Sequence, residues 1–284
     1  MFVKANRRVL GMLDGQYLAI ARGRSMDFDD LRAYVAGDEV KDIDWKATAR
    51  HGSALVRNYT ANRQHELVLL VDTGRNMAAA AESGEPKSEL AITVAGVLGY
   101  LSIRHGDRVS LAHGDETGVQ RLPAGGTEGD LERLLRRIQR HTRLDAPFSD
   151  LVTLLEDALH AIRRRSIVVV VTDDVGVSPA VEDAVRSLHA RHELLWVTVA
   201  DADLVGATAP GQRLVEVVDA WAVPDFIRGN AALQAEFDAA EAVSADRTRE
   251  AMERLGISHV RVGSADAVVP ALLTMLGRRA RARR

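Results

Sequence analysis

From residue 65 onward, short runs of strand-forming residues alternate with longer amphipathic stretches. The short runs cover residues 67–71, 166–171, 193–199 and 258–262, and the first of them is wholly apolar. A fully apolar run of that length indicates a strand that is buried on both faces of a parallel sheet. The longer stretches between the runs indicate helices, so the pattern predicts strands joined by helical crossovers.

Residues that begin or end helices divide the amphipathic stretches. Pro86 and Ser88 open a helical stretch that Gly106 ends. Thr127–Asp130 resembles a capping box with Asp in place of Glu, and Ser178–Pro179 pairs an N-cap with a proline at the first helical position. Further helices are expected up to about residue 141, from 149, from about 231 to 255 and after 262, and a hairpin is expected from strands 108–112 and 118–122 around residues 113–116.

These elements predict the α/β fold class, with a doubly wound, mostly parallel, Rossmann-like sheet whose hairpin adds one antiparallel edge strand. Residues 65–284 are expected to form this domain, with an irregular insertion at about 201–229 that includes a short strand at 214–218. Residues 1–64 are polar and interrupted by glycines, and they are interpreted as an N-terminal β-rich extension with strand-like pieces at 31–35 and 54–59.

Composition narrows the functional classes. The chain has 284 residues with a formal net charge of −3, which argues against a general nucleic-acid binder. The absence of cysteine excludes disulfides and thiolate metal sites. No apolar run reaches the roughly 20 residues needed to cross a bilayer, so no membrane span and a cytoplasmic location are expected. The arginine-rich residues 278–284 are interpreted as a disordered, solvated end, with an acidic partner, nucleic acid or acidic lipid as the alternatives.

Two aspartates at strand ends form the candidate site. Asp72 and Asp173 each follow a predicted strand, and Ser149 begins the helix between them. Ligand sites of parallel sheets lie at the carboxyl ends of the strands, and oxygen ligands of this kind suit Mg²⁺. The alternative is that these residues cap turns and helices, which is common for aspartate.

Other catalytic patterns are missing from the sequence. There is no P-loop, no G-x-S-x-G elbow and no H-E-x-x-H pair. The histidines His65, His105 and His113 are interpreted as turn or surface residues. The remaining enzymatic hypothesis is a metal-dependent hydrolase or nuclease that uses Asp72, Asp173 and Asp174.

The strand-end pattern resembles the von Willebrand factor A fold, whose metal-ion-dependent adhesion site carries Asp-x-Ser-x-Ser. The matching positions here are Asp72, Gly74, Asn76, Ser149 and Asp173. Both motif serines are replaced, so the resemblance implies a degenerate site in which Asp72, Asn76, Ser149 and Asp173 would be the remaining metal ligands. Arg75 brings a cation to the motif, and a cation opposes metal binding. No cofactor is expected, and Mg²⁺ stays open as the alternative.

Residues 28–50 strongly resemble the signature of the DUF58 family, which runs Leu-Arg-x-Tyr-x-x-Gly-Asp, Ile-Asp-Trp and Ala-Arg. The matching motif residues are Arg32, Tyr34, Gly37, Asp38, Asp44, Trp45 and Arg50. We expect Trp45 to bury its apolar body. An ion-pair network that holds the extension on the sheet is expected from Arg32, Arg50, Asp38, Asp42 and Asp44. A patch for docking a partner is the alternative.

This resemblance implies a non-enzymatic binding or adaptor protein, because DUF58 proteins are typically encoded beside MoxR-type AAA+ ATPases. The expected partners are such an ATPase and an unknown client protein, in a chaperone-like assembly or maturation process; a nucleic-acid partner is not expected. The contact surface would lie around Asp72, Asn76, Ser149 and Asp173, with Arg75 reaching a carboxylate of the partner.

Overall fold

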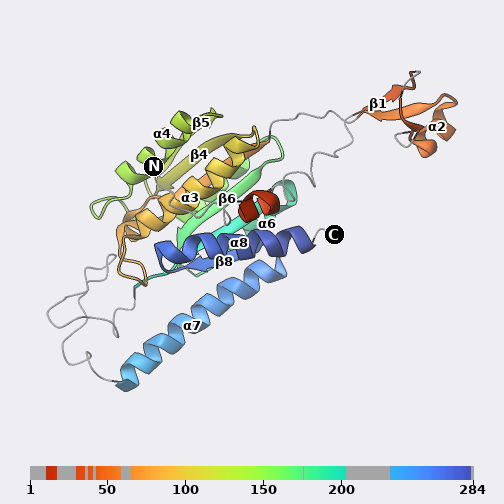
Figure 1. The fold of residues 1–284 in the computed structure, drawn as a ribbon. Helices are drawn as coiled ribbons and strands as arrows, with labels where there is room; N and C mark the ends of the chain where they lie inside the picture. The colour runs from red at the N-terminus through yellow and green to blue at the C-terminus, as the bar shows by residue number, and fades with distance from the viewer. Residues whose placement is uncertain are drawn as a thin grey trace.

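The computed structural model describes residues 11–17, 30–35, 38–40, 43–58, 65–174, 176–202 and 231–282. Its largest part is a six-stranded sheet. The strands are Glu66–Asp72 (β3), Arg108–Asp115 (β4), Gly118–Gly125 (β5), Ile167–Asp173 (β6), Glu193–Val199 (β7) and Ser258–Val262 (β8). They lie in the order β5–β4–β3–β6–β7–β8 (Figure 1). The predicted insertion at 201–229, with its short strand, falls almost entirely outside the described residues.

Every neighbouring pair of strands in this sheet is parallel except β4 and β5, which are antiparallel. A sheet whose order reverses beside its first strand is the doubly wound arrangement, and helical crossovers produce it. The predicted α/β class and the antiparallel edge strand are therefore confirmed, in agreement with the von Willebrand A-like resemblance.

The predicted hairpin turn at 113–116 is wrong. β4 continues to Asp115, which pairs with Gly118, so only Glu116 and Thr117 form the turn. Gly114 is a strand residue rather than a turn residue. A Cβ at Gly114 would lie 2.6 Å from the carbonyl oxygen of Gly118, so the glycine permits the close approach of the two strands.

The helices of the sheet domain begin and end near the residues that the sequence predicts. They are the short 3-10 helix Arg75–Ala78 (η2) and the α-helices Lys87–Arg104 (α3), Glu128–His141 (α4), Leu151–Ala161 (α5), Pro179–Arg191 (α6), Ala231–Arg254 (α7) and Ala265–Ala282 (α8). The capping box of Thr127 and Asp130 is present, and Ser178 caps α6 before Pro179. Gly106 and Gly256 follow helices with φ of 80° and 70°, a conformation that glycine adopts without strain.

Helices cover both faces of the sheet (Figure 1). The side chains of Leu67, Leu69 and Val71 pack in a core with α3, α4 and α8. Val68 and Leu70 point to the other face and pack in a second core with α5 and α6. This alternation explains why the β3 sequence is apolar at every position, since each side chain enters one of two cores.

The N-terminal part contains two separate structural pieces. Residues 11–17 form a helix that packs on the sheet domain: Tyr17 stacks on His105 with ring centroids 5.7 Å apart, and Asp14 pairs with His105 at 2.9 Å. Asp30–Ala33 (β1) and Leu55–Asn58 (β2) form a two-stranded antiparallel sheet with the helix Trp45–His51 (α2). The division of the chain at residue 64 stays a prediction.

Within the 30–58 unit, the family motif residues stabilise local structure. Arg32 pairs with Asp38 at 2.7 Å and holds the pKa of that carboxyl at about 2. Asp44 accepts hydrogen bonds from the backbone N–H groups of Lys46 and Ala47 and so caps α2. Both contacts join residues of this unit to one another. An ion-pair network between the extension and the six-stranded sheet stays a prediction. Gly37 and Asp42 lie outside the described residues.

The predicted burial of Trp45 is wrong. Its side chain is 64% exposed, and Tyr34 is exposed as well. Trp45 is the first residue of α2, whose described residues include none that are buried. A two-stranded sheet with one short helix offers little apolar surface, so the large aromatic side chain remains in contact with solvent.

The arginine-rich end is not a disordered tail over its described residues. Residues 278–282 complete α8, and Arg279 donates from Nε to the buried carboxylate of Glu193 and from Nη1 to the carbonyl oxygen of Gly256 at 2.9 Å. This pair joins α8 to the start of β7. Among the described helices, none combines the length and the apolarity that a bilayer crossing requires.

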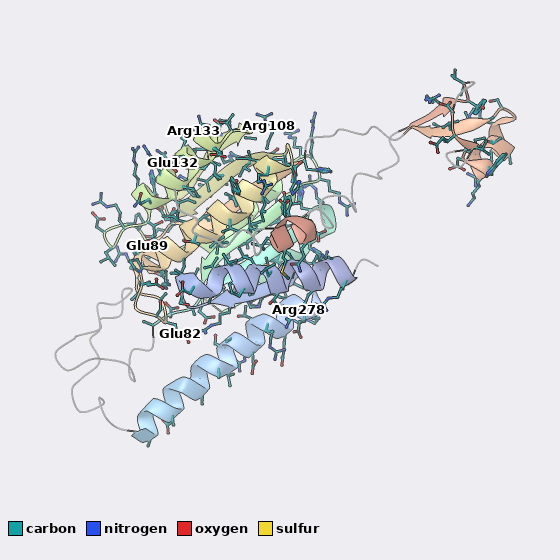
Figure 2. The ribbon with its side chains drawn as sticks, in the orientation of Figure 1. Glu82, Glu89, Arg108, Glu132, Arg133 and Arg278 are labelled. Atoms are coloured by element: carbon teal, nitrogen blue, oxygen red, sulfur yellow. The ribbon has the colours of Figure 1, made fainter. Side chains whose placement is uncertain are left out.

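We expect Arg279→Ala to lower the free energy of unfolding by about 1 to 2 kcal/mol, because the carboxylate of Glu193 would stay buried after losing a cationic donor. Arg278→Ala is the matched control, since Arg278 is an exposed arginine of the same helix (Figure 2). Urea denaturation measures both. Equal stability of the two variants would contradict a structural role for Arg279.

Candidate functional site at the carboxyl edge of the sheet

The structure brings the predicted site residues to one edge of the sheet. Asp72 is the last residue of β3 and Asp173 the last of β6, and these strands are parallel neighbours. Asn76 lies in η2, directly after β3. Ser149 lies in the loop before α5, which Asp150 caps by accepting a hydrogen bond from the backbone N–H of Thr153.

The carboxyl group of Asp72 is buried, with 2% of the residue exposed. Its Oδ1 accepts a hydrogen bond of 2.9 Å from the backbone N–H of Gly74. Burial and, second, the nearby charge of Asp173 raise its pKa to about 7, against the opposing effects of the Gly74 N–H, the Ser149 hydroxyl and Lys87. A carboxyl group held in this state costs stability, which is typical of functional sites.

Three buried oxygen atoms at this edge make no hydrogen bond of regular geometry with any residue that the structure describes. They are Oδ2 of Asp72, Oδ1 of Asn76 and Oγ of Ser149. Buried acceptors are normally satisfied by protein groups, water or an ion. These atoms are therefore the part of the predicted motif that retains the ability to bind a ligand.

The loop before α5 is closed onto the motif. A Cβ at Gly74 would lie 2.5 Å from the Cα, N and Oγ atoms of Ser149. The backbone N–H of Arg75 donates to the carbonyl oxygen of Pro147 at 2.9 Å, and its Nε donates to Ala146 at 2.8 Å. Its guanidinium carbon lies 4.1 Å from the centre of the Phe148 ring. Arg75 therefore holds the 146–149 loop.

The cation beside the strand-end carboxylates is Lys87, the first residue of α3. Its side chain is 1% exposed, and its Nζ lies 3.7 Å from Oδ2 of Asp173. Nζ also contacts Oδ1 of Asp201, which follows β7 and is 42% exposed. A lysine at the start of a helix is unfavourable to the helix dipole. This unusual position of Lys87 is the sequence signal that could have identified it as a site residue. Asp201 is a third strand-end carboxylate that the same positional rule could have found.

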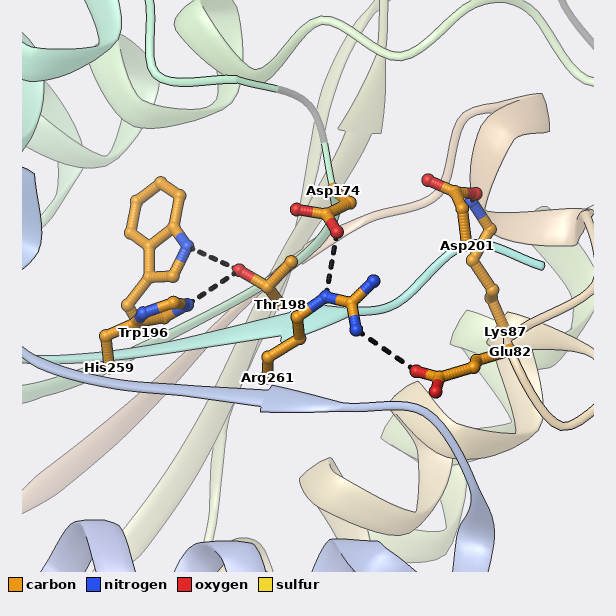
Figure 3. Close-up of polar contacts among 8 residues, drawn as sticks. All are labelled: Glu82, Lys87, Asp174, Trp196, Thr198, Asp201, His259 and Arg261. Carbon is orange, nitrogen blue, oxygen red and sulfur yellow. Dashed lines mark hydrogen bonds and ion pairs between the residues drawn. The ribbon is translucent and has the colours of Figure 1, made fainter. Parts of the chain in front are cut away.

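A second ion-pair cluster borders the first (Figure 3). Arg261 of β8 donates from Nε to Asp174 at 2.9 Å and from Nη1 to Glu82 at 3.1 Å. The carboxylate of Asp174 is therefore bound to an arginine, which weakens the predicted hydrolase centre of Asp72, Asp173 and Asp174. Among the described residues, no three His, Asp or Glu side chains form a group that could hold a metal ion.

A buried histidine, His113, flanks the site, contrary to the prediction that it is a turn or surface residue. His113 lies in β4 and is 1% exposed, with its Nδ1 3.2 Å from the hydroxyl of Thr73. Burial and, second, the charge of nearby His141 lower its pKa to about 4. The neutral ring fits a strand position between two cores, because only an uncharged imidazole can be buried there at low cost.

The residues present do not fit the Mg²⁺ site of the von Willebrand resemblance. The buried oxygens of Asp72, Asn76 and Ser149, which make no hydrogen bond of regular geometry, are suitable ligands for a hard cation. Gly74 supplies no ligand, however, and Ser149 fills the space in which a serine side chain at position 74 would extend. The ammonium group of Lys87 adds a positive charge among the carboxylates and repels a divalent ion.

Sequence and structure comparisons place the chain among known proteins. Uncharacterized proteins of Mycobacterium tuberculosis and Mycobacterium bovis are 28% identical over 217 residues, which covers 76% of this chain and 68% of each relative. Among solved structures, a von Willebrand factor type A protein from Catenulispora acidiphila aligns with a TM-score of 0.44 and 12% identity over 78% of this chain and 43% of that one. The PilB minor pilin of Streptococcus sanguinis aligns with a TM-score of 0.49 and 7% identity over 81% of this chain and 65% of that one.

A comparison with protein families supports the family signature of residues 28–50, and its match extends over most of the chain. Residues 30–249 match the family described as "Protein of unknown function DUF58". This range includes the 30–58 unit, the strand-end aspartates and Lys87, and it covers well over half of the sequence. The chain therefore belongs to the DUF58 family.

Proposed function

We propose that this protein is a non-enzymatic binding module that works with a MoxR-type AAA+ ATPase in the chaperone-like assembly or maturation of a client protein. The contact surface is the carboxyl edge of the sheet. The genomic association of the family, given above, is the reason for naming this class of ATPase. The choice of surface rests on one observation. At this edge the carboxylates of Asp72 and Asp173 are buried, while those of Glu82 and Asp201 are accessible to a partner.

The accessible groups at this edge are acidic. Glu82 is 59% exposed in the loop before α3, and Asp201 is 42% exposed after β7. Asp72 and Asp173 lie beneath them and are almost fully buried. Because a partner meets Glu82 and Asp201 first, its contacting residues would be arginine or lysine.

This arrangement changes the expected role of Arg75. Its guanidinium is engaged by Ala146 and Phe148, so it stabilises the loop instead of standing free for a carboxylate of the partner. A variant at Arg75 would disturb the loop as well as any contact, and Glu82 is the better residue to test.

The test is capture of the purified MoxR-type ATPase from the same organism by the immobilised protein. We expect Glu82→Lys to reduce capture at least about tenfold, since reversal of a charge at a complementary interface costs 1.4 kcal/mol or more.

Glu132→Lys is the matched control. Glu132 is a partly exposed glutamate on α4 that pairs with one arginine, Arg136, as Glu82 pairs with Arg261. Figure 2 shows the two glutamates on different parts of the domain. Loss of capture in both variants, or in neither, would refute the proposed surface.

A further inference from the structure

Lys87 is placed where a lysine is costly. Its side chain is 1% exposed, and it occupies the first position of α3, where the helix dipole is unfavourable to a cation. A buried ammonium group persists only when anionic partners compensate for its lost hydration. The structure supplies two such partners, Asp173 at the end of β6 and Asp201 after β7, and Asp72 at the end of β3 lies near enough for the lysine charge to act on it.

The contacts of Lys87 connect these carboxylates. Nζ lies 3.7 Å from Asp173 and touches Asp201, and its charge acts on Asp72. The ammonium group is thus the positive centre of an edge that also holds three buried oxygens without a hydrogen bond of regular geometry, on Asp72, Asn76 and Ser149. These oxygens are the hard ligands that remain of the adhesion-site motif.

We infer that the Lys87 ammonium group is a built-in cation that takes the electrostatic place of a divalent metal ion at this edge and keeps such an ion out. The carboxylates stay close together because Lys87 neutralises part of their charge. The edge is therefore assembled without metal, and its charge does not vary with the Mg²⁺ concentration. This inference concerns the edge itself and holds whatever partner the surface binds.

The inference predicts that removal of the lysine creates a metal site. Lys87→Met leaves the oxygen atoms in place and takes away the competing charge. We expect the melting temperature of the wild-type protein to change by less than about 1 °C in about 5 mM MnCl₂, and that of Lys87→Met to rise by about 5 °C. Titration calorimetry with MnCl₂ should find one ion per chain in the variant only.

A second variant covers the case in which Lys87→Met does not fold. Lys87→Met combined with Asp201→Asn removes one negative charge together with the positive one, so the net charge of the edge equals that of the wild-type protein. It retains Asp72, Asp173, Asn76 and Ser149, and it should also bind Mn²⁺. Lys87→Arg keeps the cation and should bind none.

Two outcomes would overturn the inference about Lys87. Binding of one Mn²⁺ per chain by the wild-type protein would overturn the inference, whatever happens to the variants. Folded variants without Lys87 that gain no metal binding would overturn it as well. Metal binding is read directly and not through a partner, so failure of the ATPase to bind would count against the proposed function and not against the role of Lys87.

Discussion

Asp72→Asn is expected to stabilise the protein by about 2 to 4 kcal/mol at pH 8. Asn is nearly the same size as Asp, and its amide oxygen can still accept the hydrogen bond from the backbone N–H of Gly74. The change removes a buried negative charge that lies close to Asp173, and these are the two main causes of the raised pKa. The neutral side chain avoids both costs.

The stability gained by Asp72→Asn should increase with pH. The carboxyl of Asp72 has a pKa of about 7 in the folded protein against an ordinary value of 3.8, so the folded state holds its proton more tightly than the unfolded state. Ionisation of Asp72 therefore lowers the stability of the wild-type protein as pH rises from about 4 to 7, and Asp72→Asn lacks this contribution. The advantage of the variant should be small near pH 4, grow through this range and level off above pH 7.

Asp173→Asn is the control with the opposite expected sign. Asp173 is also a buried aspartate at a strand end, but it pairs with the buried Lys87, so its neutralisation should lower stability. Urea denaturation at about pH 5 and pH 8 measures both variants. Destabilisation by Asp72→Asn at pH 8 would contradict the assignment, because it would mean that the ionised carboxylate is satisfied by a cation in the folded protein.

The second large effect is expected from Gly74→Ser, which restores the first serine of the adhesion-site motif. A Cβ at this position would lie 2.5 Å from backbone atoms of Ser149, so the 146–149 loop would have to move away. That movement would strain or break the hydrogen bonds of Arg75 with Pro147 and Ala146. We expect a loss of about 3 kcal/mol, the upper range for overpacking.

The restored motif should not restore metal binding. Lys87 remains beside the carboxylates, and the displaced loop carries Ser149 away from the other ligands. Thermal unfolding with and without MgCl₂ tests both expectations. Asn76→Ser is the matched control: it restores the other motif serine with a smaller side chain, so no overpacking is expected. An unchanged stability of Gly74→Ser would show that the loop opens freely, and a metal-dependent gain would contradict the exclusion of the ion.

Much of the fold was predictable because its determinants are local. The run from Leu67 to Val71 is apolar throughout, and this requires burial on both faces. Thr127 with Asp130 and Ser178 with Pro179 set helix starts through contacts that span only three or four residues. The predictions failed at residues whose role depends on contacts with distant parts of the chain. Gly114 read as a turn glycine but allows two strands to approach, and Trp45 read as a core residue although its unit has no core large enough to cover it.

By itself, the sequence determined the fold class, the family and the edge at which Asp72, Asn76, Ser149 and Asp173 meet, since strand ends and motif spacing are properties of the chain order. Only the tertiary structure decided what that edge contains. Lys87 reaches Asp173 and Asp201 because α3 starts beside the ends of β6 and β7, which lie 86 and more residues further along the chain. The position of Arg75 on the 146–149 loop is decided in the same way. Charges that approach one another through folding, and not through spacing in the sequence, determine which cation the edge holds.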